Sequence, residues 1–221
     1  MLKIVLLLFQ KELKLELRRR SVISGISLYV FSLVFICYIT FSLRNNTISE
    51  ATWSALFWLA ILFSVINSVA KSFIGERKGL FIYYYSIASA QAIIFSKILY
   101  NTLLCFALSA VGYFLFSIFI DNPVQDQPLF WSILFLTSWG FSASLSLISG
   151  IAAKANNSNI LMAVLSFPVL IALLLLAIKA TKNVLDGLDR STSTDELWNI
   201  LAINCILTAL AYLLFRYIWR S

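Results

Sequence analysis

The sequence predicts an all-α integral membrane protein with six transmembrane helices, preceded by an amphipathic helix at the membrane surface. Two observations predict this class. Of the 221 residues, 61% are hydrophobic and 12% are charged, whereas soluble domains carry roughly 25% charged residues. The hydrophobic residues also gather into runs of about 20 residues, the length that an α-helix needs to cross a bilayer. Because these spans use most of the chain, residues 1–221 are expected to form a single transmembrane domain.

Six apolar runs are the expected spans. They cover about residues 22–43, 53–73, 98–120, 129–153, 160–179 and 198–219. The fourth run carries small residues, which permit another helix to approach closely in lipid. These small residues are Gly140, Ser142, Ser146, Ser149 and Gly150. Pro168 is expected to interrupt the fifth run, because proline lacks the N–H group that a helix interior uses.

Residues 1–21 predict a helix that lies in the membrane interface ahead of the first span. Five apolar residues recur at spacings of three and four and share one face, while lysines fall on another face. The alternative is an extended lead-in to the first span, since only five apolar positions define the period. Lysines are scattered through the apolar run, so we do not expect a cleaved signal peptide. The residues assigned to the interfacial helix are Leu6, Phe9, Leu13, Arg18, Arg19 and Arg20.

A segment that gathers charge, glycine and aromatic side chains separates the second run from the third. Gly75 and Gly79 bracket the cluster Glu76-Arg77-Lys78, so the backbone can turn sharply on both sides of these charges. Three consecutive tyrosines follow, and tyrosine favours the boundary between lipid and water. The pattern predicts a helix–loop–helix knob over residues 74–91. An ordinary interfacial loop is the alternative, because basic aromatic loops beside membrane helices are common.

Charge asymmetry predicts that both termini face the cytoplasm. With six spans, 13 of the 17 basic residues fall on the side of the N-terminus, and the acidic residues fall mainly on the other side. Cytoplasmic segments of membrane proteins are enriched in Lys and Arg. The knob and the shorter loop at 154–159 are therefore expected on the cytoplasmic side.

The spans and the composition argue against several kinds of chemistry. No Asp, Glu, Lys or Arg lies near the middle of any run, which disfavours an ion-coupled carrier. The chain has no histidine and no phosphate-binding loop, so we assign it no catalytic, metal or cofactor-binding site. Cys37, Cys105 and Cys205 stand singly, and we give them no chemical role. The intramembrane side chains expected to hydrogen-bond between helices are Asn67, Asn101 and Asn204.

The order of these features resembles the permease subunits of type-2 ABC exporters, and within them the haem exporter B (CcmB) family of cytochrome c maturation. The resemblance covers nearly the whole chain. Its residues are Lys11-Glu12, Arg18-Arg19-Arg20, Glu76-Arg77, Gly79, Ser86, Lys97 and Pro168. Two positions depart from the family pattern. Ile87 follows Ser86 where the family usually has proline, and Ala172 stands in the place of a second proline.

The resemblance implies a non-catalytic, multi-pass subunit of the bacterial inner membrane, with both termini in the cytoplasm. A separate CcmA-like ATPase would bind ATP and drive haem export or release of a haem-loaded chaperone. The segment 74–91 would contact that ATPase through Glu76, Arg77, Gly79, Leu80, Phe81, Tyr84 and Ser86. The other implied partners are a CcmC-like haem-handling subunit, a CcmD-like single-span subunit, a CcmE-like haem chaperone and a second copy of this chain. Membrane lipid surrounds the chain, and no nucleic acid is expected as a partner.

Two other functions stay open at this point. A type-2 permease that exports lipid, polysaccharide or a drug would share the knob, and a structural or assembly subunit would share the spans. An ATPase that copurifies with the chain would exclude the structural subunit. A cytochrome c defect on deletion would separate the CcmB-like function from the other export functions.

Overall fold

The computed structural model describes residues 2–18, 20–42, 48–69, 88–120, 122–153 and 158–220, and nearly all of them are helical. No strand occurs in these ranges, which agrees with the predicted all-α class. The helices are α1 (Leu2–Arg18), α2 (Arg20–Ser42), α3 (Glu50–Val69), α5 (Ala90–Phe119), α6 (Gln127–Ala152), α7 (Ser158–Leu185) and α8 (Arg190–Arg220).

Five of these helices, α3, α5, α6, α7 and α8, are long and apolar enough to cross a membrane. Helix α2 is 23 residues long and contains a shorter apolar stretch, Leu28–Phe41, in its described part. At about 1.5 Å per residue, a helix of this length extends about 35 Å, more than the roughly 30 Å of a hydrocarbon core. Helix α2 therefore corresponds to the first of the six expected spans.

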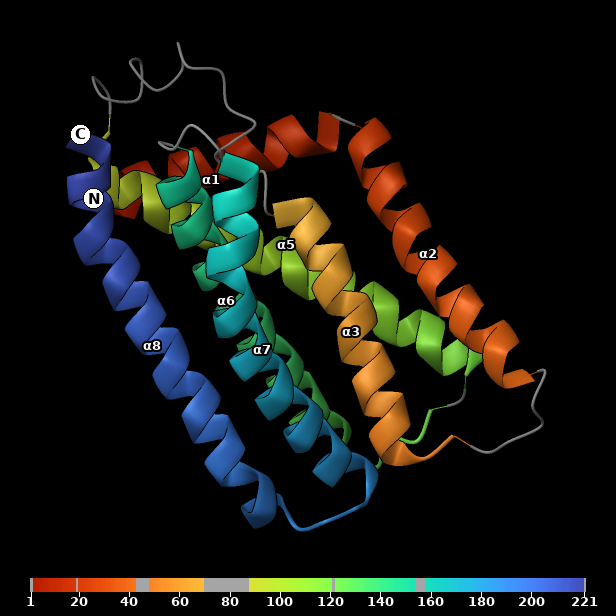
Figure 1. Cartoon of the computed structure of the whole chain (residues 1–221). Coiled ribbons are helices and arrows are strands. Elements are labelled where there is room, and N and C mark those ends of the chain that lie inside the picture. The colour runs from red at the N-terminus through yellow and green to blue at the C-terminus, as the bar shows by residue number, and fades with distance from the viewer. Residues whose placement is uncertain are drawn as a thin grey trace.

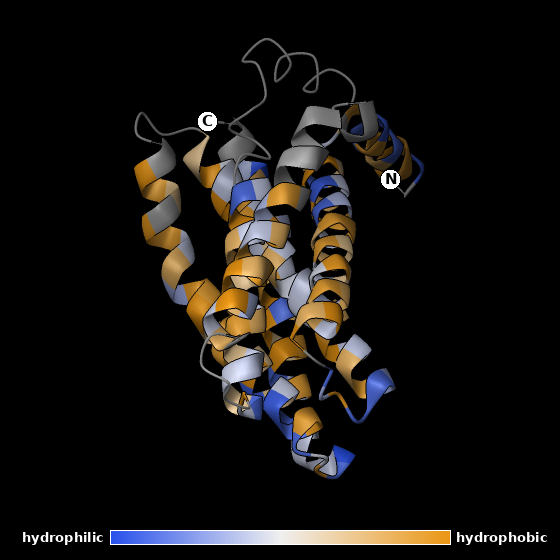
Figure 2. Ribbon diagram, turned by 90° about the vertical axis from the view of Figure 1, so that its right-hand side faces the viewer, coloured by the Kyte–Doolittle hydropathy of each residue, from blue (hydrophilic) through white to orange (hydrophobic). Residues whose placement is uncertain are grey.

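The N-terminal helix α1 lies across one end of the bundle, whereas the other helices run between the two ends (Figure 1). Both chain termini lie at the end that carries α1. Figure 2 shows that hydrophobic residues dominate between the ends, and that hydrophilic residues gather toward the ends. This arrangement fits a helix at the membrane surface that is followed by a set of spans.

Helix α5 begins well before the span that the sequence predicts at residue 98. Ser89 is its N-cap, and the Ser89 hydroxyl accepts a hydrogen bond from the Ala92 amide at 3.3 Å. Such a cap satisfies one of the amides that a helix start leaves without a partner. The helix therefore includes Lys97, a charged residue that the hydropathy pattern placed outside the span.

The end of the bundle opposite α1 also differs from the prediction. Helix α7 continues to Leu185 and α8 starts at Arg190, so the polar stretch between the last two spans is mostly helical. Gly187 turns the chain between them with a φ of 67°, a left-handed conformation that costs glycine little. Pro168 lies inside α7 and does not end it. The expected interruption is therefore wrong, since membrane helices tolerate proline where neighbouring groups compensate the lost hydrogen bond.

Helix α6 is the central helix, and it contacts α5, α7 and α8. Its glycines set how closely these neighbours approach. A Cβ atom added to Gly140 would lie 2.4 Å from the Asn204 side-chain oxygen, and one added to Gly150 would lie 2.7 Å from the Phe215 ring. Ser142, Ser146 and Ser149 are fully buried. The prediction that this run uses small residues for close helix packing is confirmed.

Aromatic rings fill the core near the end opposite α1. The Trp53 and Phe57 rings of α3 stack with centroids 5.3 Å apart, and the Phe57 and Phe116 rings meet edge-on at 5.4 Å. Phe130 of α6 is fully buried beside them. Aromatic pairs of this kind contribute about 0.5–1.5 kcal/mol beyond their buried area. This part of the bundle is a packed core.

Candidate functional site

The predicted knob leads directly into α5. The residues assigned to its contacts all lie outside the described residues: Glu76, Arg77, Gly79, Leu80, Phe81, Tyr84 and Ser86. The next described residue is Ala88, and Ala90 and Gln91 lie in the first turn of α5. The segment 74–91 therefore ends inside α5, and its last residues belong to that helix.

Helix α1 packs against α5 and α2. Phe9 and Leu13 are partly buried, and Leu6 is 54% exposed. Arg18 is the last residue of α1 and Arg20 the first of α2, while Arg19 lies outside the described residues. The predicted N-terminal helix is thus present, and its position in the membrane interface stays a prediction.

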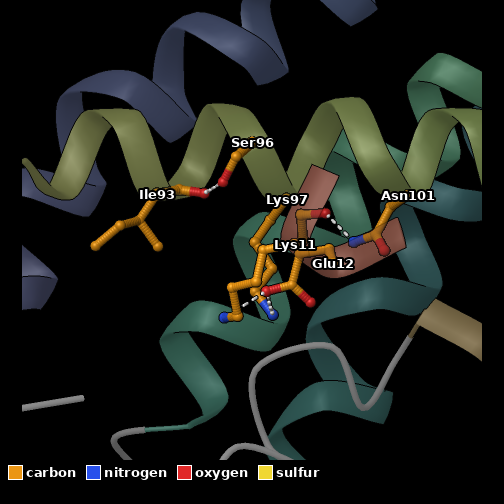
Figure 3. Close-up of polar contacts among 7 residues, drawn as sticks. Lys11, Glu12, Ile93, Ser96, Lys97 and Asn101 are labelled. Atoms are coloured by element: carbon orange, nitrogen blue, oxygen red, sulfur yellow. Dashed lines mark hydrogen bonds and ion pairs between the residues drawn. The ribbon is translucent and has the colours of Figure 1, made fainter. Parts of the chain in front are cut away.

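An ion pair joins α1 to α5 in a buried setting. The Lys97 side chain is 5% exposed, and its Nζ lies 3.7 Å from Oε1 of Glu12. Lys11 Nζ lies 3.2 Å from the same oxygen. Figure 3 shows Lys97 pointing from α5 toward Glu12, with Lys11 reaching the same carboxylate. Removing one member of a buried pair leaves a charge that is costly to keep away from water, so this contact holds α1 and α5 in one arrangement.

Side-chain hydrogen bonds continue from this pair along the contact between α5 and α6. The Asn101 amide donates to the Ser146 hydroxyl at 2.8 Å, and the Ser142 hydroxyl donates to the Ile98 carbonyl at 2.7 Å. Farther along, the Ser109 and Ser138 hydroxyls lie 3.5 Å apart. We call these six residues the polar seam. Interhelical hydrogen bonds in membranes average about 0.6 kcal/mol each and reach about 1.7 kcal/mol, so several in a row fasten two helices firmly.

The polar seam ends near the side of the bundle opposite α1. There the Asn122 amide donates to the Tyr113 hydroxyl at 3.0 Å, and that hydroxyl donates to Gln127 Oε1 at 3.0 Å. Lys97, Asn101, Ser109 and Tyr113 of α5 are all buried. Because each step of four residues turns about 40° around a helix, these residues wind from one side of α5 to the other. Buried polar side chains therefore occur along α5 from the Glu12–Lys97 pair to the far end of the bundle.

Ion pairs also stabilise this end of the bundle. The sequence alone did not indicate which of these residues would pair with each other. Arg190 donates to Asp126 through Nε at 2.5 Å and Nη2 at 3.1 Å. The hydrogen bonds from the Arg190 guanidinium lower the pKa of Asp126. Between α7 and α8, Lys179 Nζ lies 2.7 Å from the buried Glu196 carboxylate. The first pair fixes the α5–α6 connection to the start of α8, and the second joins α7 to α8.

Two of the three asparagines behave as predicted. Asn101 bonds to α6 through the polar seam, and the Asn204 amide of α8 donates to the Leu136 carbonyl of α6 at 2.8 Å. Asn67 is exposed and donates to the Phe63 carbonyl of its own helix at 2.9 Å. The prediction is wrong for Asn67, because that side chain faces away from the bundle.

Within the described ranges, no group of three or more His, Cys, Asp or Glu side chains is placed to hold a metal ion. Cys37, Cys105 and Cys205 are free thiols in separate helices. The functional feature that sequence reasoning missed is the pairing of Glu12 with Lys97. A signal was present, since a lysine inside a long apolar helix needs a nearby carboxylate to be buried.

The fold and this site define a class of protein: an all-α, multi-pass membrane protein with an N-terminal helix joined to one span by a buried ion pair. The family model described as CcmB protein matches residues 3–214, nearly the whole chain. The chain therefore belongs to the CcmB family, which makes it a membrane permease of the ABC transporter for cytochrome c maturation. Comparison with curated proteins and with solved structures gave no match.

Proposed function

We propose that this chain receives the motion of a separate CcmA-like ATPase through residues 74–91, and passes it to the spans through α5. The observation that carries the proposal is the buried Glu12–Lys97 pair, whose ammonium and carboxylate groups are 3.7 Å apart. It fastens α1 to α5 a short way after the proposed contact segment. A push on that segment therefore acts on α1 and α5 together.

The length of α5 and its contacts support this path. The helix has 30 residues, so it extends about 45 Å, from one end of the bundle to the other. The polar seam fastens α6 to it from Ile98 to Ser109, about a third of this length. A displacement at Ala90 would therefore move α5 and α6 as a pair.

The rest of the assembly follows from the family. We propose that the cycle exports haem or releases a haem-loaded, CcmE-like chaperone, with CcmC-like and CcmD-like subunits and a second copy of this chain in the complex. We further propose that the end carrying α1 faces the cytoplasm of a bacterium with the chain in its inner membrane. The excess of basic residues on that side and the position of both termini there support this orientation.

The test is a double variant in the contact segment, Glu76→Ala with Phe81→Ala, in membranes that contain equal amounts of the chain. Truncating interface anchors costs about 2 kcal/mol or more each, so we expect ATPase copurification and cytochrome c maturation to fall together. The matched control is Trp198→Ala, because Trp198 is 68% exposed at the opposite end of the bundle. Phe130 is unsuitable as a control, since it is fully buried. Normal ATPase binding and maturation in the double variant would show that the segment is not the contact.

A further inference from the structure

An apolar groove lies between α1, α5, α6 and α8. Its volume is about 690 Å³, and its lining includes Phe9, Leu99, Leu103, Phe135, Trp139 and Thr208. This volume is in the range of about 300–1,000 Å³ that is usual for sites that bind small molecules. It is too small to hold a transmembrane helix, whose diameter with side chains is about 10–12 Å over about 30 Å of length.

The length of the groove along α5 matches the thickness of one membrane leaflet. Its lining residues on α5 run from Phe95 to Phe106, which spans about 16 Å along the helix axis. Half of a hydrocarbon core is about 15 Å. Phe9 places one end of the groove at α1, the helix that lies across the end of the bundle (Figure 1). An acyl chain of the leaflet on the α1 side would therefore fit along it.

One basic residue, Arg216, follows the groove along α8. Thr208, Tyr212 and Arg216 are spaced by four along α8 and share one face. Thr208 lines the groove, and the Tyr212 ring lies 5.8 Å from the ring of Phe95, another lining residue. The exposed Arg216 continues this row toward the end of the bundle.

Helix α8 gives Arg216 no acidic neighbour along its own length. Helix α8 has no acidic residue after Glu196. Basic pockets between membrane helices favour anionic lipid headgroups.

We propose that this groove binds one anionic phospholipid of the leaflet on the α1 side, with an acyl chain along α5 and the headgroup at Arg216. The inference does not depend on the proposed coupling path, since it rests on the groove and its charge. Bound lipid in this position would fill the space between α1 and α8 and hold α1 against the bundle.

Trp139 lies in the groove and serves as the probe. The full chain is reconstituted in phosphatidylcholine vesicles. Increasing amounts of one brominated lipid are added, either phosphatidylglycerol or phosphatidylcholine, and in both lipids the bromine is on the acyl chains. The signal is the part of the tryptophan quenching that disappears in Trp139→Phe. We expect half-maximal quenching at about a fivefold lower fraction of the anionic lipid, the preference that about one basic residue provides.

Two variants decide the outcome. Arg216→Gln should remove most of the preference for the anionic lipid, and Thr208→Phe should fill the groove and reduce quenching by both lipids. Thr40→Phe is the matched control, because Thr40 is exposed on α2 and, like Thr208, bonds to a carbonyl of its own helix at about the same distance, 2.8 Å against 2.7 Å. Equal quenching by both lipids in every variant would show that the groove contacts membrane lipids without preferring the anionic one, and this would overturn the proposal. Absence of quenching by either lipid would show that protein covers the groove, which also overturns it.

Discussion

The Glu12–Lys97 pair provides the sharpest test of the proposed coupling path. The perturbation is a double-mutant cycle of Glu12→Gln, Lys97→Met and the two together. Glu12→Gln leaves the Lys97 ammonium, which is 5% exposed, without the carboxylate that lies 3.7 Å away. Breaking a buried pair costs about 3–5 kcal/mol. We expect a loss of about 3 kcal/mol in the free energy of unfolding, at the lower end because Glu12 is 17% exposed.

The double variant should lose less than the sum of the single variants, because replacing both charges leaves no buried ion. Contacting groups show coupling energies of about 0.5–3 kcal/mol, and we expect about 1–2 kcal/mol here. Lys11→Gln is the control. Its side chain is 35% exposed, and exposed pairs are worth about 0–1 kcal/mol, so its effect should be small.

The measurement is unfolding of the purified chain in mixed micelles, followed by tryptophan fluorescence. In parallel, cytochrome c maturation is compared at equal amounts of protein in the membrane. If the pair transmits motion, the double variant should recover stability without recovering maturation. Additive losses in stability, with a coupling energy near zero, would refute the idea that these two groups fasten α1 to α5.

Three further predictions address orientation, packing and pH. A reporter that is active only outside the cytoplasm should be silent when fused after Ser221 and active when inserted at the turn after Gly187, and the reverse result would invert the orientation. Gly140→Ala should lower the free energy of unfolding by about 1–3 kcal/mol, because its Cβ would meet the Asn204 oxygen that the Leu136 hydrogen bond holds in place. Gly112→Ala should cost less, since its Cβ would meet the tip of the flexible Ile61 side chain, and equal losses would contradict this reading of the two sites. Arg190 lowers the pKa of Asp126 in the folded chain. The stabilisation from this pair is therefore present above the pKa of Asp126 in the unfolded chain, about 3.9, and is lost as the pH falls through the lower pKa of the folded chain. Asp126→Asn keeps a residue that can cap α6. Below about pH 4, the melting temperature of this variant should depend less on pH than that of the unchanged chain. Identical pH profiles would show that the pair contributes nothing to stability.

The sequence predicts the class of this fold well because lipid imposes simple rules on length and polarity. The runs of about 20 apolar residues and the small residues of α6 follow directly from these rules. The helix ends do not, since hydropathy cannot show that Ser89 caps a helix through Lys97, or that polar residues before Trp198 extend α8 beyond the apolar run. The Ser89 cap is local, but the buried charges within these extensions have partners on other helices: Lys97 pairs with Glu12, and Glu196 pairs with Lys179.

The candidate site shows the same division. The resemblance drew attention to Glu12 and Lys97 separately, yet they are 85 positions apart in the sequence and no periodicity links them. Asn101 and Asn204 could be predicted as hydrogen-bonding residues from their polarity alone. Their partners could not, because Ser146 and the Leu136 carbonyl become neighbours only through the packing of α6.

The distribution of hydrogen bonds also indicates where the bundle can move at least cost. Separating α5 from α6 would break the polar seam in apolar surroundings, where each group is left without water. In the described part of α2, by contrast, Ser32 and Thr40 bond within their own helix, and the Phe31 ring meets the Phe119 ring of α5 at 5.9 Å. Lipid tails are as apolar as these side chains, so moving α2 exchanges protein contacts for similar lipid contacts. A displacement carried by α5 and α6 would therefore change their contacts with α2 before it separated α5 from α6.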